Sequence, residues 1–212
     1  MTAPSASPSA EFWEPRYSSV GPEWGREPNA RLIAILPRLA LRPGLAWDLG
    51  CGHGGDAFWL ASLGWHVTAT DVSATAVRRV ARTAMELELR DRVTAERHDL
   101  SRTFPEGTFH LVYGCYFHSP VPLDRDSILR DAADRVRPGG CFVLIDHGSA
   151  APWAWRPDGK EPEFRTPAQT LADISLGPGW VTEMCEPATR IATGPDGQTA
   201  TVTDNVIVLR RQ

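Results

Sequence analysis

Apolar residues follow two alternating spacings along the chain, and this alternation predicts an α/β fold. Short segments rich in apolar and β-branched residues predict strands at residues 45–49, 65–70, 93–97, 109–114 and 141–146. Apolar residues three or four positions apart predict helices at residues 29–39, 56–63, 73–87 and 128–136. Strands that alternate with helices pair in parallel through right-handed crossovers, so the sequence predicts a three-layer, doubly wound sheet.

The end of the chain departs from this alternation. Residues 180–191 and 199–210 both have the pattern of strands, and the turn Gly194-Pro195-Asp196-Gly197 joins them without a helix. Two strands joined by a short turn pair antiparallel. The predicted fold is therefore a Rossmann-like sheet of seven strands, mostly parallel, that ends in an antiparallel C-terminal hairpin. Pro138-Gly139-Gly140 is expected to close the helix before the fifth strand.

Composition divides the chain into a tail and one domain. Residues 1–10 are rich in Pro, Ala and Ser, which predicts a disordered tail. Residues 11–212 are expected to form a single domain, since 42% of the chain is hydrophobic and its length suits one core. Within this domain, residues 11–40 precede the first strand and are expected to form an N-terminal lid and a helix.

The lid hypothesis comes from four aromatic residues in a polar stretch, Phe12, Trp13, Tyr17 and Trp24. Aromatic side chains are costly to leave in water. In a doubly wound fold, the surface that most needs cover is the ligand crevice at the strand ends. We therefore expect residues 12–29 to cover that crevice; packing of the same aromatic residues elsewhere on the domain is the alternative.

Charge and cysteine content argue against several classes of partner. The net charge is -4, so no overall basic field attracts nucleic acid or anionic lipid. No apolar stretch of about 18 residues and no signal-peptide pattern occurs in the sequence. Four cysteines without a C-x-x-C pair favour reduced thiols over a metal site. We expect a cytoplasmic monomer or homodimer without a metal, bound to neither nucleic acid nor membrane.

The strongest local signal is the run W-D-L-G-C-G-H-G-G at residues 47–55. An acid ends a strand, glycines follow, and a helix begins, at the edge where ligands bind in this fold. Gly50, Gly52 and Gly55 also satisfy the dinucleotide pattern G-x-G-x-x-G, with Asp71 about 20 residues on, where a ribose-binding acid is expected. These positions predict a nucleoside site, with a tight turn that binds no ligand as the alternative.

The charge of Asp48 distinguishes between two nucleoside ligands. A carboxylate beside the loop disfavours the pyrophosphate of NAD, because like charges repel. S-adenosylmethionine has no phosphate, and its α-amino group and sulfonium are both attracted to an acid. The sequence therefore favours S-adenosylmethionine and leaves an NAD-linked oxidoreductase as the alternative.

The motif D-L-G-C-G-H-G resembles motif I of the class I S-adenosylmethionine-dependent methyltransferases. His98-Asp99-Leu100, residues 109–114 and Arg137-Pro138-Gly139-Gly140 match further family elements in the same order. The resemblance implies that Asp71 hydrogen-bonds both ribose hydroxyls and that Asp99 and Leu100 contact adenine. The cofactor-binding residues are then expected to be Trp13, Tyr17, Asp48, Gly50, Cys51, Gly52, Gly54, Asp71, Val72, Asp99, Leu100 and Gly114.

The N-terminal aromatic residues and the small size resemble tellurite-resistance and thiopurine-type small-molecule methyltransferases. This resemblance implies methyl transfer to a small-molecule acceptor by in-line attack on the sulfonium methyl, with the protein positioning the reactants. Oxyanions, thiols, phenols, amines and natural-product intermediates all fit as acceptors. A protein that binds the cofactor without catalysis and serves as an interaction module is a further alternative.

Residues 115–118, after the fourth strand, are candidates for the acceptor side. His118 is expected either to act as a general base, since imidazole titrates near neutrality, or to pack within its loop. Tyr116 is expected to form a pocket wall rather than the base, because a phenol pKa is about 10. His147 is a second candidate base, with exposure on a loop as its alternative.

Residues 148–165 are rich in Pro and Trp and too irregular for a helix or strand. Long irregular insertions in compact domains are often lids, so Trp153 and Trp155 are candidates to fold over the acceptor pocket. A surface loop whose tryptophans pack on the core is the alternative.

Overall fold

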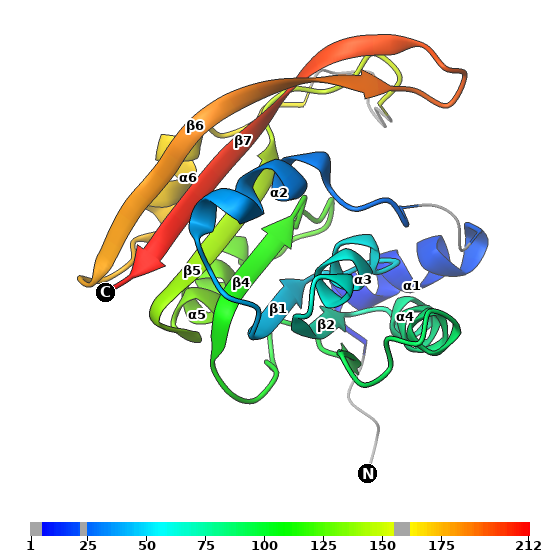
Figure 1. Ribbon diagram of the computed structural model, residues 1–212. Coiled ribbons are helices and arrows are strands. Elements are labelled where there is room, and N and C mark those ends of the chain that lie inside the picture. Colours follow the sequence, from blue (N-terminus) through cyan, green and yellow to red (C-terminus); the bar gives the residue numbers. More distant parts are fainter. Residues whose placement is uncertain (1–5, 22–24, 155–161) are drawn as a thin grey trace.

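The computed structural model describes residues 6–21, 25–154 and 162–212, and they form one mixed seven-stranded sheet with helices on both faces (Figure 1). The strand order is β3-β2-β1-β4-β5-β7-β6. The strands are β1 (Leu45–Leu49), β2 (His66–Asp71), β3 (Val93–Arg97), β4 (Phe109–Cys115), β5 (Val136–His147), β6 (Trp180–Thr193) and β7 (Thr199–Arg211). β1 to β5 are parallel, and β7 pairs antiparallel with β5 and β6. The predicted sheet and its C-terminal hairpin are confirmed.

Helices cover the two faces of the sheet and one of its edges. The helices are α1 (Pro8–Ser19), α2 (Ala30–Ile35), α3 (Gly55–Ser62), α4 (Ala74–Glu86), α5 (Arg125–Ala133) and α6 (Pro167–Ile174), and a 3-10 helix, Leu36–Leu39, follows α2. Buried residues of α2, α3 and α4 pack on one face, and those of α5 and α6 pack on the other. α1 lies at the carboxyl ends of the parallel strands and packs against α4.

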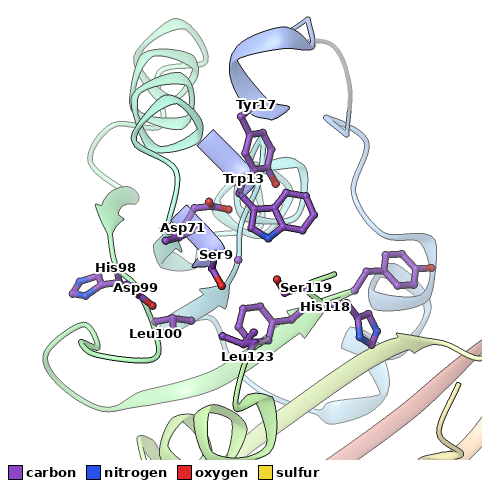
Figure 2. Close-up of a pocket in the computed structure, with 14 residues that line it drawn as sticks. Ser9, Trp13, Tyr17, Asp71, His98, Asp99, Leu100, His118, Ser119 and Leu123 are labelled. Carbon is purple, nitrogen blue, oxygen red and sulfur yellow. The ribbon is translucent and has the colours of Figure 1, made fainter. Parts of the chain in front are cut away.

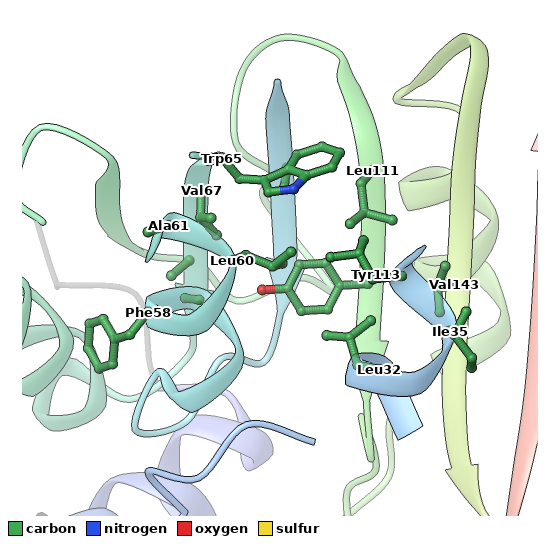
Figure 3. Close-up of a cluster of buried hydrophobic side chains, with 14 of the residues drawn as sticks. Leu32, Ile35, Phe58, Leu60, Ala61, Trp65, Val67, Leu111, Tyr113 and Val143 are labelled. Carbon is green, nitrogen blue, oxygen red and sulfur yellow. The ribbon is translucent and has the colours of Figure 1, made fainter. Parts of the chain in front are cut away.

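Large side chains alternate between the two faces and form a core on each. Tyr113 of β4 lies among Leu32, Leu60 and Trp65 on the face covered by α2 and α3 (Figure 3). Trp47 of β1 is fully buried on the opposite face. Its indole N–H donates to the Thr70 hydroxyl at 2.9 Å, so the polar atom of this buried ring has a partner.

The start of β5 corrects two expectations. Val136 was expected on a helix, but α5 ends at Ala133 and Val136 pairs with Phe109 in the sheet. The pairing resumes at Leu111 with Cys141, so a bulge lies inside β5 where residues 138–140 were expected to separate helix from strand. An apolar residue four positions after Ala132 fits the spacing of a helix, and in this chain burial in the sheet decides its structure.

The N-terminal region also differs from expectation. α1 begins at Pro8, inside the segment predicted to be a disordered tail, because the Ser7 hydroxyl caps the helix by accepting from Ala10 N at 3.3 Å. Proline is favourable in the first turn, where no N–H is needed. The helix expected at 29–39 is α2, capped by Asn29, followed by the 3-10 turn. The unpredicted α6 begins at a capping box between Thr166 and Gln169.

A close backbone approach joins the N-terminal region to the glycine loop. A Cβ added at Gly55 would lie 2.6 Å from the carbonyl oxygen of Arg26 and 2.7 Å from that of Glu27. Both atoms belong to the backbone, so neither rotates away. Gly55 therefore permits the segment before α2 to lie against the start of α3.

We predict that Gly55→Ala lowers the free energy of unfolding by about 1–3 kcal/mol, since the methyl group forces two backbone segments apart. Urea denaturation followed by circular dichroism measures the change. Gly177→Ala is the matched control because nothing lies within 4 Å of a Cβ at that position. Equal stability of the Gly55→Ala variant and the unmodified protein would contradict this prediction.

Candidate functional site

A cavity, called the first cavity below, lies at the carboxyl ends of β1, β2 and β4 beneath α1. Figure 2 shows Trp13 and Tyr17 on one side of this space, with Leu100 and Leu123 across from them. Its walls come from segments far apart in the chain. The lining residues are Ser9, Trp13, Tyr17, Gly50, Asp71, Val72, His98, Asp99, Leu100, Tyr116, Phe117, His118, Ser119 and Leu123.

Asp71, at the end of β2, organises one wall of the first cavity. Its Oδ2 accepts from the N–H of Gly52 at 3.0 Å, and its Oδ1 accepts from the N–H of Ser73 at 2.9 Å. Burial raises the pKa of Asp71 to about 6, and these backbone donors only partly offset that effect. The cavity thus contains a carboxyl group whose charge changes just below neutral pH.

The glycine loop has the left-handed conformation that its composition suggests. Gly50, Gly52 and Gly54 have φ values of 68°, 54° and 82°, which residues with a Cβ rarely adopt. A Cβ at Gly52 would lie 3.0 Å from the hydroxyl oxygen of Tyr17, and one at Gly50 would lie 2.8 Å from the ring of Phe117. Bare backbone at these positions therefore keeps the space beside the loop available.

Asp48 is buried behind the loop rather than in the cavity wall. Its side chain is on the core face beside Tyr113, and the residue is only 3% exposed. Among the described residues, no donor makes a hydrogen bond of good geometry to its Oδ2. Burial, followed by the charge of Asp56, raises the pKa of Asp48 well above its usual value. Asp48 therefore does not line the first cavity, contrary to the expectation from the sequence, whereas Asp71 does.

The segment after β3 forms part of the wall of the first cavity. Asp99 and Leu100 both line it, as does His98, whose N–H donates to the Asp71 carbonyl at 3.0 Å. Partial burial raises the pKa of Asp99, but hydrogen bonds from Ser101 and Ser7 outweigh that effect and lower it. An ionised acceptor is thus present at the position where the resemblance implies contact with adenine.

α1 is held over the cavity by one carboxylate. Glu14 accepts from the hydroxyls of Ser73 and Thr75, both at 2.6 Å, and from the N–H of Thr75 at 3.1 Å. Partial burial raises its pKa, but these hydrogen bonds outweigh that effect and bring it to about 2. Arg79 adds a hydrogen bond to the Tyr17 carbonyl at 2.6 Å. α1 is thus attached to the start of α4 through charged groups.

A second cavity adjoins the first and shares Trp13, Tyr116, His118 and Ser119 with it. Its remaining walls come from α1, from the ends of β4 and β5, and from the segment before α6. The residues found only in this second cavity are Phe12, Arg16, Pro120, Arg125, Asp146, His147, Pro162, Glu163, Phe164, Arg165 and Thr170.

His118 lies at the boundary between the two cavities, beside a buried carboxylate. Its Nε2 is 3.3 Å from Oδ1 of Asp146, and its side chain is 40% exposed. Arg125 donates from one nitrogen to both oxygens of Asp146, at 2.5 and 2.7 Å. Burial raises the pKa of Asp146, but its contacts with His118 and Arg125 outweigh that effect and lower it. An ionised Asp146 can therefore orient the imidazole.

Tyr116 is a fixed wall. Its hydroxyl donates to Asp204 at 2.8 Å and accepts from Arg190 at 3.1 Å. Burial and Asp204 raise its pKa to about 12, so it is a poor base at neutral pH. His147 stacks on the Tyr116 ring at 4.0 Å, and burial followed by the charge of His118 lowers its pKa to about 4. His147 lies at the end of β5 and is half-buried by this stacking, rather than exposed on a loop.

The structure thus brings together many of the expected residues and leaves others outside the cavity walls. The expected residues that line the first cavity are Trp13, Tyr17, Gly50, Asp71, Val72, Asp99, Leu100, Tyr116 and His118, and those that do not are Asp48, Cys51, Gly52, Gly54 and Gly114. Trp24 and Trp155 lie outside the described residues. Trp153 packs by Gly194 of the hairpin rather than over a cavity.

Sequence reasoning missed several residues of the two cavities. Ser9 was assigned to a disordered tail, and Asp146 and Arg125 carried no motif of their own. The signal that could have found Asp146 is its position at the end of a parallel strand beside the ligand edge. The described residues contain no group of three His, Cys, Asp or Glu side chains arranged to hold a metal.

Residues 46–140 match the family model of a methyltransferase domain. An uncharacterized methyltransferase from Synechocystis is 32% identical over 124 residues, which are 58% of this chain and 56% of that protein. A ribosomal RNA small subunit methyltransferase C from Alcanivorax borkumensis is 30% identical over 107 residues, 49% of this chain and 32% of that protein. The chain therefore matches about half of the first curated relative and a third of the second.

Solved structures with the same fold cover nearly the whole chain. One, from a study of the conversion of a disulfide bond into a thioacetal group during echinomycin biosynthesis, has a TM-score of 0.71 and 22% identity, covering 96% of this chain and 93% of that one. Geranyl diphosphate C-methyltransferase from Streptomyces coelicolor has a TM-score of 0.67 and 16% identity, covering 98% and 100%. TehB from Haemophilus influenzae has a TM-score of 0.66 and 13% identity, and the match covers 96% of this chain and 67% of that one.

The doubly wound sheet, its C-terminal hairpin and the glycine loop after β1 define the class I methyltransferase fold. This chain has that fold, and residues 46–140 match the family model of a methyltransferase domain. At the level of the fold, the likeness to TehB agrees with the resemblance to tellurite-resistance methyltransferases noted in the sequence.

The pKa of Asp71 leads to a prediction about nucleoside binding. A carboxylate accepts hydrogen bonds from ribose hydroxyls better than a carboxylic acid does, so affinity for S-adenosylhomocysteine should rise as pH increases through about 6. We expect roughly a tenfold gain between pH 5 and 7.5, measured by calorimetry, with release of protons on binding near pH 6. Asp71→Asn should bind more weakly and lose this pH dependence. Affinity that falls with rising pH would contradict the assignment.

Proposed function

We propose that this protein transfers the methyl group of S-adenosylmethionine to a small-molecule acceptor. The observation that carries the proposal is the first cavity, which combines the glycine loop, Asp71 and Asp99 at the carboxyl ends of parallel strands. S-adenosylmethionine supplies an electrophilic methyl group on its sulfonium. The chain then needs to bind it, align an acceptor with it and exclude water.

The residues of the first cavity fit this ligand. Asp71 is placed to accept from the ribose hydroxyls, Asp99 and Leu100 to contact adenine, and the backbone at Gly50 to face the methionine portion. The other glycines of the loop and Asp48 support this backbone from behind. Two acidic residues and no Lys or Arg side chain of the described residues line the cavity. This charge distribution suits a sulfonium and an α-amino group, and it provides no cation for the pyrophosphate of NAD.

The second cavity supports a small molecule as the acceptor. It adjoins the first cavity at His118 and Tyr116, the residues expected at the acceptor side from the sequence. The net charge of -4 gives no field for a nucleic acid, although one relative is named a ribosomal RNA methyltransferase. No helix of the described residues is long and apolar enough to cross a membrane. The described cysteines are all free, which supports a reducing compartment such as the cytoplasm.

Isothermal titration calorimetry with S-adenosylmethionine, S-adenosylhomocysteine and NAD tests the proposed function. We expect both adenosyl compounds to bind and NAD to bind at least about tenfold more weakly, a difference of about 1.4 kcal/mol. Asp71→Ala should weaken the binding of S-adenosylhomocysteine by about 1–3 kcal/mol, because charge-assisted hydrogen bonds are lost. Preference for NAD would refute the proposal and favour the oxidoreductase alternative.

The attachment of α1 gives a further prediction for the N-terminal lid. Glu14→Gln removes the charge from three hydrogen bonds to Ser73 and Thr75, so α1 should cover the cavity less of the time. We expect S-adenosylhomocysteine affinity to fall about tenfold, because each charge-assisted bond contributes about 1.5–3 kcal/mol and only part of this is lost. Calorimetry and thermal melting measure affinity and folding separately.

Glu11→Gln is the matched control for the lid, since Glu11 is an exposed residue of the same helix. It should leave affinity unchanged. Because α1 contributes nothing to the sheet, the melting temperature of Glu14→Gln should fall by only a few degrees. Retained affinity together with a lowered melting temperature would mean that α1 is a structural support rather than a lid.

A further inference from the structure

Four aromatic rings contribute to the walls of the second cavity. Phe12 and Trp13 approach from α1, Phe164 from the segment before α6, and Tyr116 from the end of β4. His147 connects two of these rings, because it stacks on Tyr116 at 4.0 Å and lies 6.1 Å from Phe164 at an angle of 59°. Aromatic surfaces favour contact with flat, apolar ligands.

Two guanidinium groups that line this cavity, those of Arg125 and Arg165, are already engaged within the protein. Arg125 is bound to Asp146, and it also donates to the Phe117 carbonyl at 2.7 Å. Arg165 donates to Asp126 and Asp173 at distances of 2.7–2.8 Å. Guanidinium groups held by carboxylates attract an anionic ligand only weakly, because their charge is compensated. These two groups therefore give no strong attraction for an anion, and we infer a neutral molecule as the ligand.

His118 is the group with proton-accepting capacity at the boundary with the first cavity. Its Nε2 faces the ionised Asp146, which favours a proton on that nitrogen. The lone pair then lies on Nδ1. Asp146 is itself fixed by Arg125, so the carboxylate orients the imidazole and compensates the positive charge that a second proton would bring.

We propose that the second cavity binds a planar aromatic acceptor with a hydroxyl group, and that Nδ1 of His118 removes the hydroxyl proton. The inference rests on the proposed function and names its substrate class. Among aromatic acceptors, an arylamine has a free lone pair and an aromatic thiol ionises near neutral pH, so neither needs the base that His118 and Asp146 form. A phenol, with a pKa of about 10, does need it.

The step balances as a displacement with proton transfer. A lone pair of the acceptor oxygen forms the new oxygen–carbon bond, and the pair of the carbon–sulfur bond remains on sulfur. The hydroxyl proton passes to Nδ1 of His118, whose positive charge Asp146 compensates, and it later leaves to solvent. Asp146 and Arg125 act as positioning residues, because they contact the imidazole or each other rather than the acceptor.

Binding of 2-naphthol to the protein saturated with S-adenosylhomocysteine is the first test. Saturation-transfer NMR compares 2-naphthol with decahydro-2-naphthol, which has the same skeleton and hydroxyl but no aromatic ring. We expect transfer to 2-naphthol only, and Phe164→Leu should weaken its binding several-fold while leaving S-adenosylhomocysteine affinity unchanged. Equal binding of the two alcohols, or no binding of 2-naphthol, would overturn the inference.

Methylation of 2-naphthol and 2-naphthalenethiol is the second test. His118→Gln should lower the rate with 2-naphthol about 10²-fold and the rate with the thiol less than tenfold, since the thiol ionises without help. Asp146→Asn should show the same preference, with S-adenosylhomocysteine affinity as the check that it folds. His66→Gln, an exposed histidine at the start of β2, is the control and should retain both rates. Equal losses for both acceptors would overturn the role of His118.

The two proposals fail in distinguishable ways. If S-adenosylhomocysteine does not bind, the proposed function is wrong. If it binds and 2-naphthol does not, the methyl-donor site stands and only the aromatic-hydroxyl inference is wrong.

Discussion

Asp71 is the residue that joins the segments around the first cavity, and its carboxyl group is buried. The side-chain oxygens of Asp71 accept from the N–H of Gly52, in the loop after β1, and from the N–H of Ser73, at the start of α4. The backbone carbonyl of Asp71 accepts from the N–H of His98, after β3. A buried carboxyl group is costly unless donors surround it. The three hydrogen bonds to Asp71 therefore fix three separate segments relative to one another. The shape of the first cavity depends on this arrangement.

Ser73 connects α1, which lies over the first cavity, with Asp71 in the cavity wall. Its N–H donates to Asp71, and its hydroxyl donates to Glu14 of α1. The helix above the cavity and the acid in its wall therefore share one residue as a hydrogen-bonding partner. Any displacement of α1 changes the environment of Ser73 and, through it, one of the donors that offset the burial of Asp71. Closure of α1 and ligand binding at Asp71 are consequently expected to be coupled.

Sequence reasoning succeeded where the determinants are local. The spacing of apolar residues, the Ser73 cap and the glycine loop each lie within a few residues, and they predicted the sheet, α4 and the turn between β1 and α3. It failed where tertiary contacts decide. Val136 fits a helix spacing but pairs with Phe109 in the sheet, and Asp48 is sequestered by core packing beside Tyr113. His118, Arg125 and Asp146 meet only because the loop after β4 returns to the end of β5, which no local pattern encodes.

The two halves of the sheet have separate tasks at the site. The parallel strands β1, β2 and β3 end around the first cavity, whereas the antiparallel hairpin reaches the second through Asp204 of β7. Asp204 is fully buried, pairs with His147 across the β5–β7 ladder and accepts from the hydroxyl of Tyr116. Tyr116 has a φ of 57°, an unfavourable conformation for a residue with a Cβ, and this hydrogen bond helps to hold it. Because the N–H of His118 donates to the Tyr116 carbonyl at 2.8 Å, the hairpin also helps to hold His118 at the boundary between the two cavities.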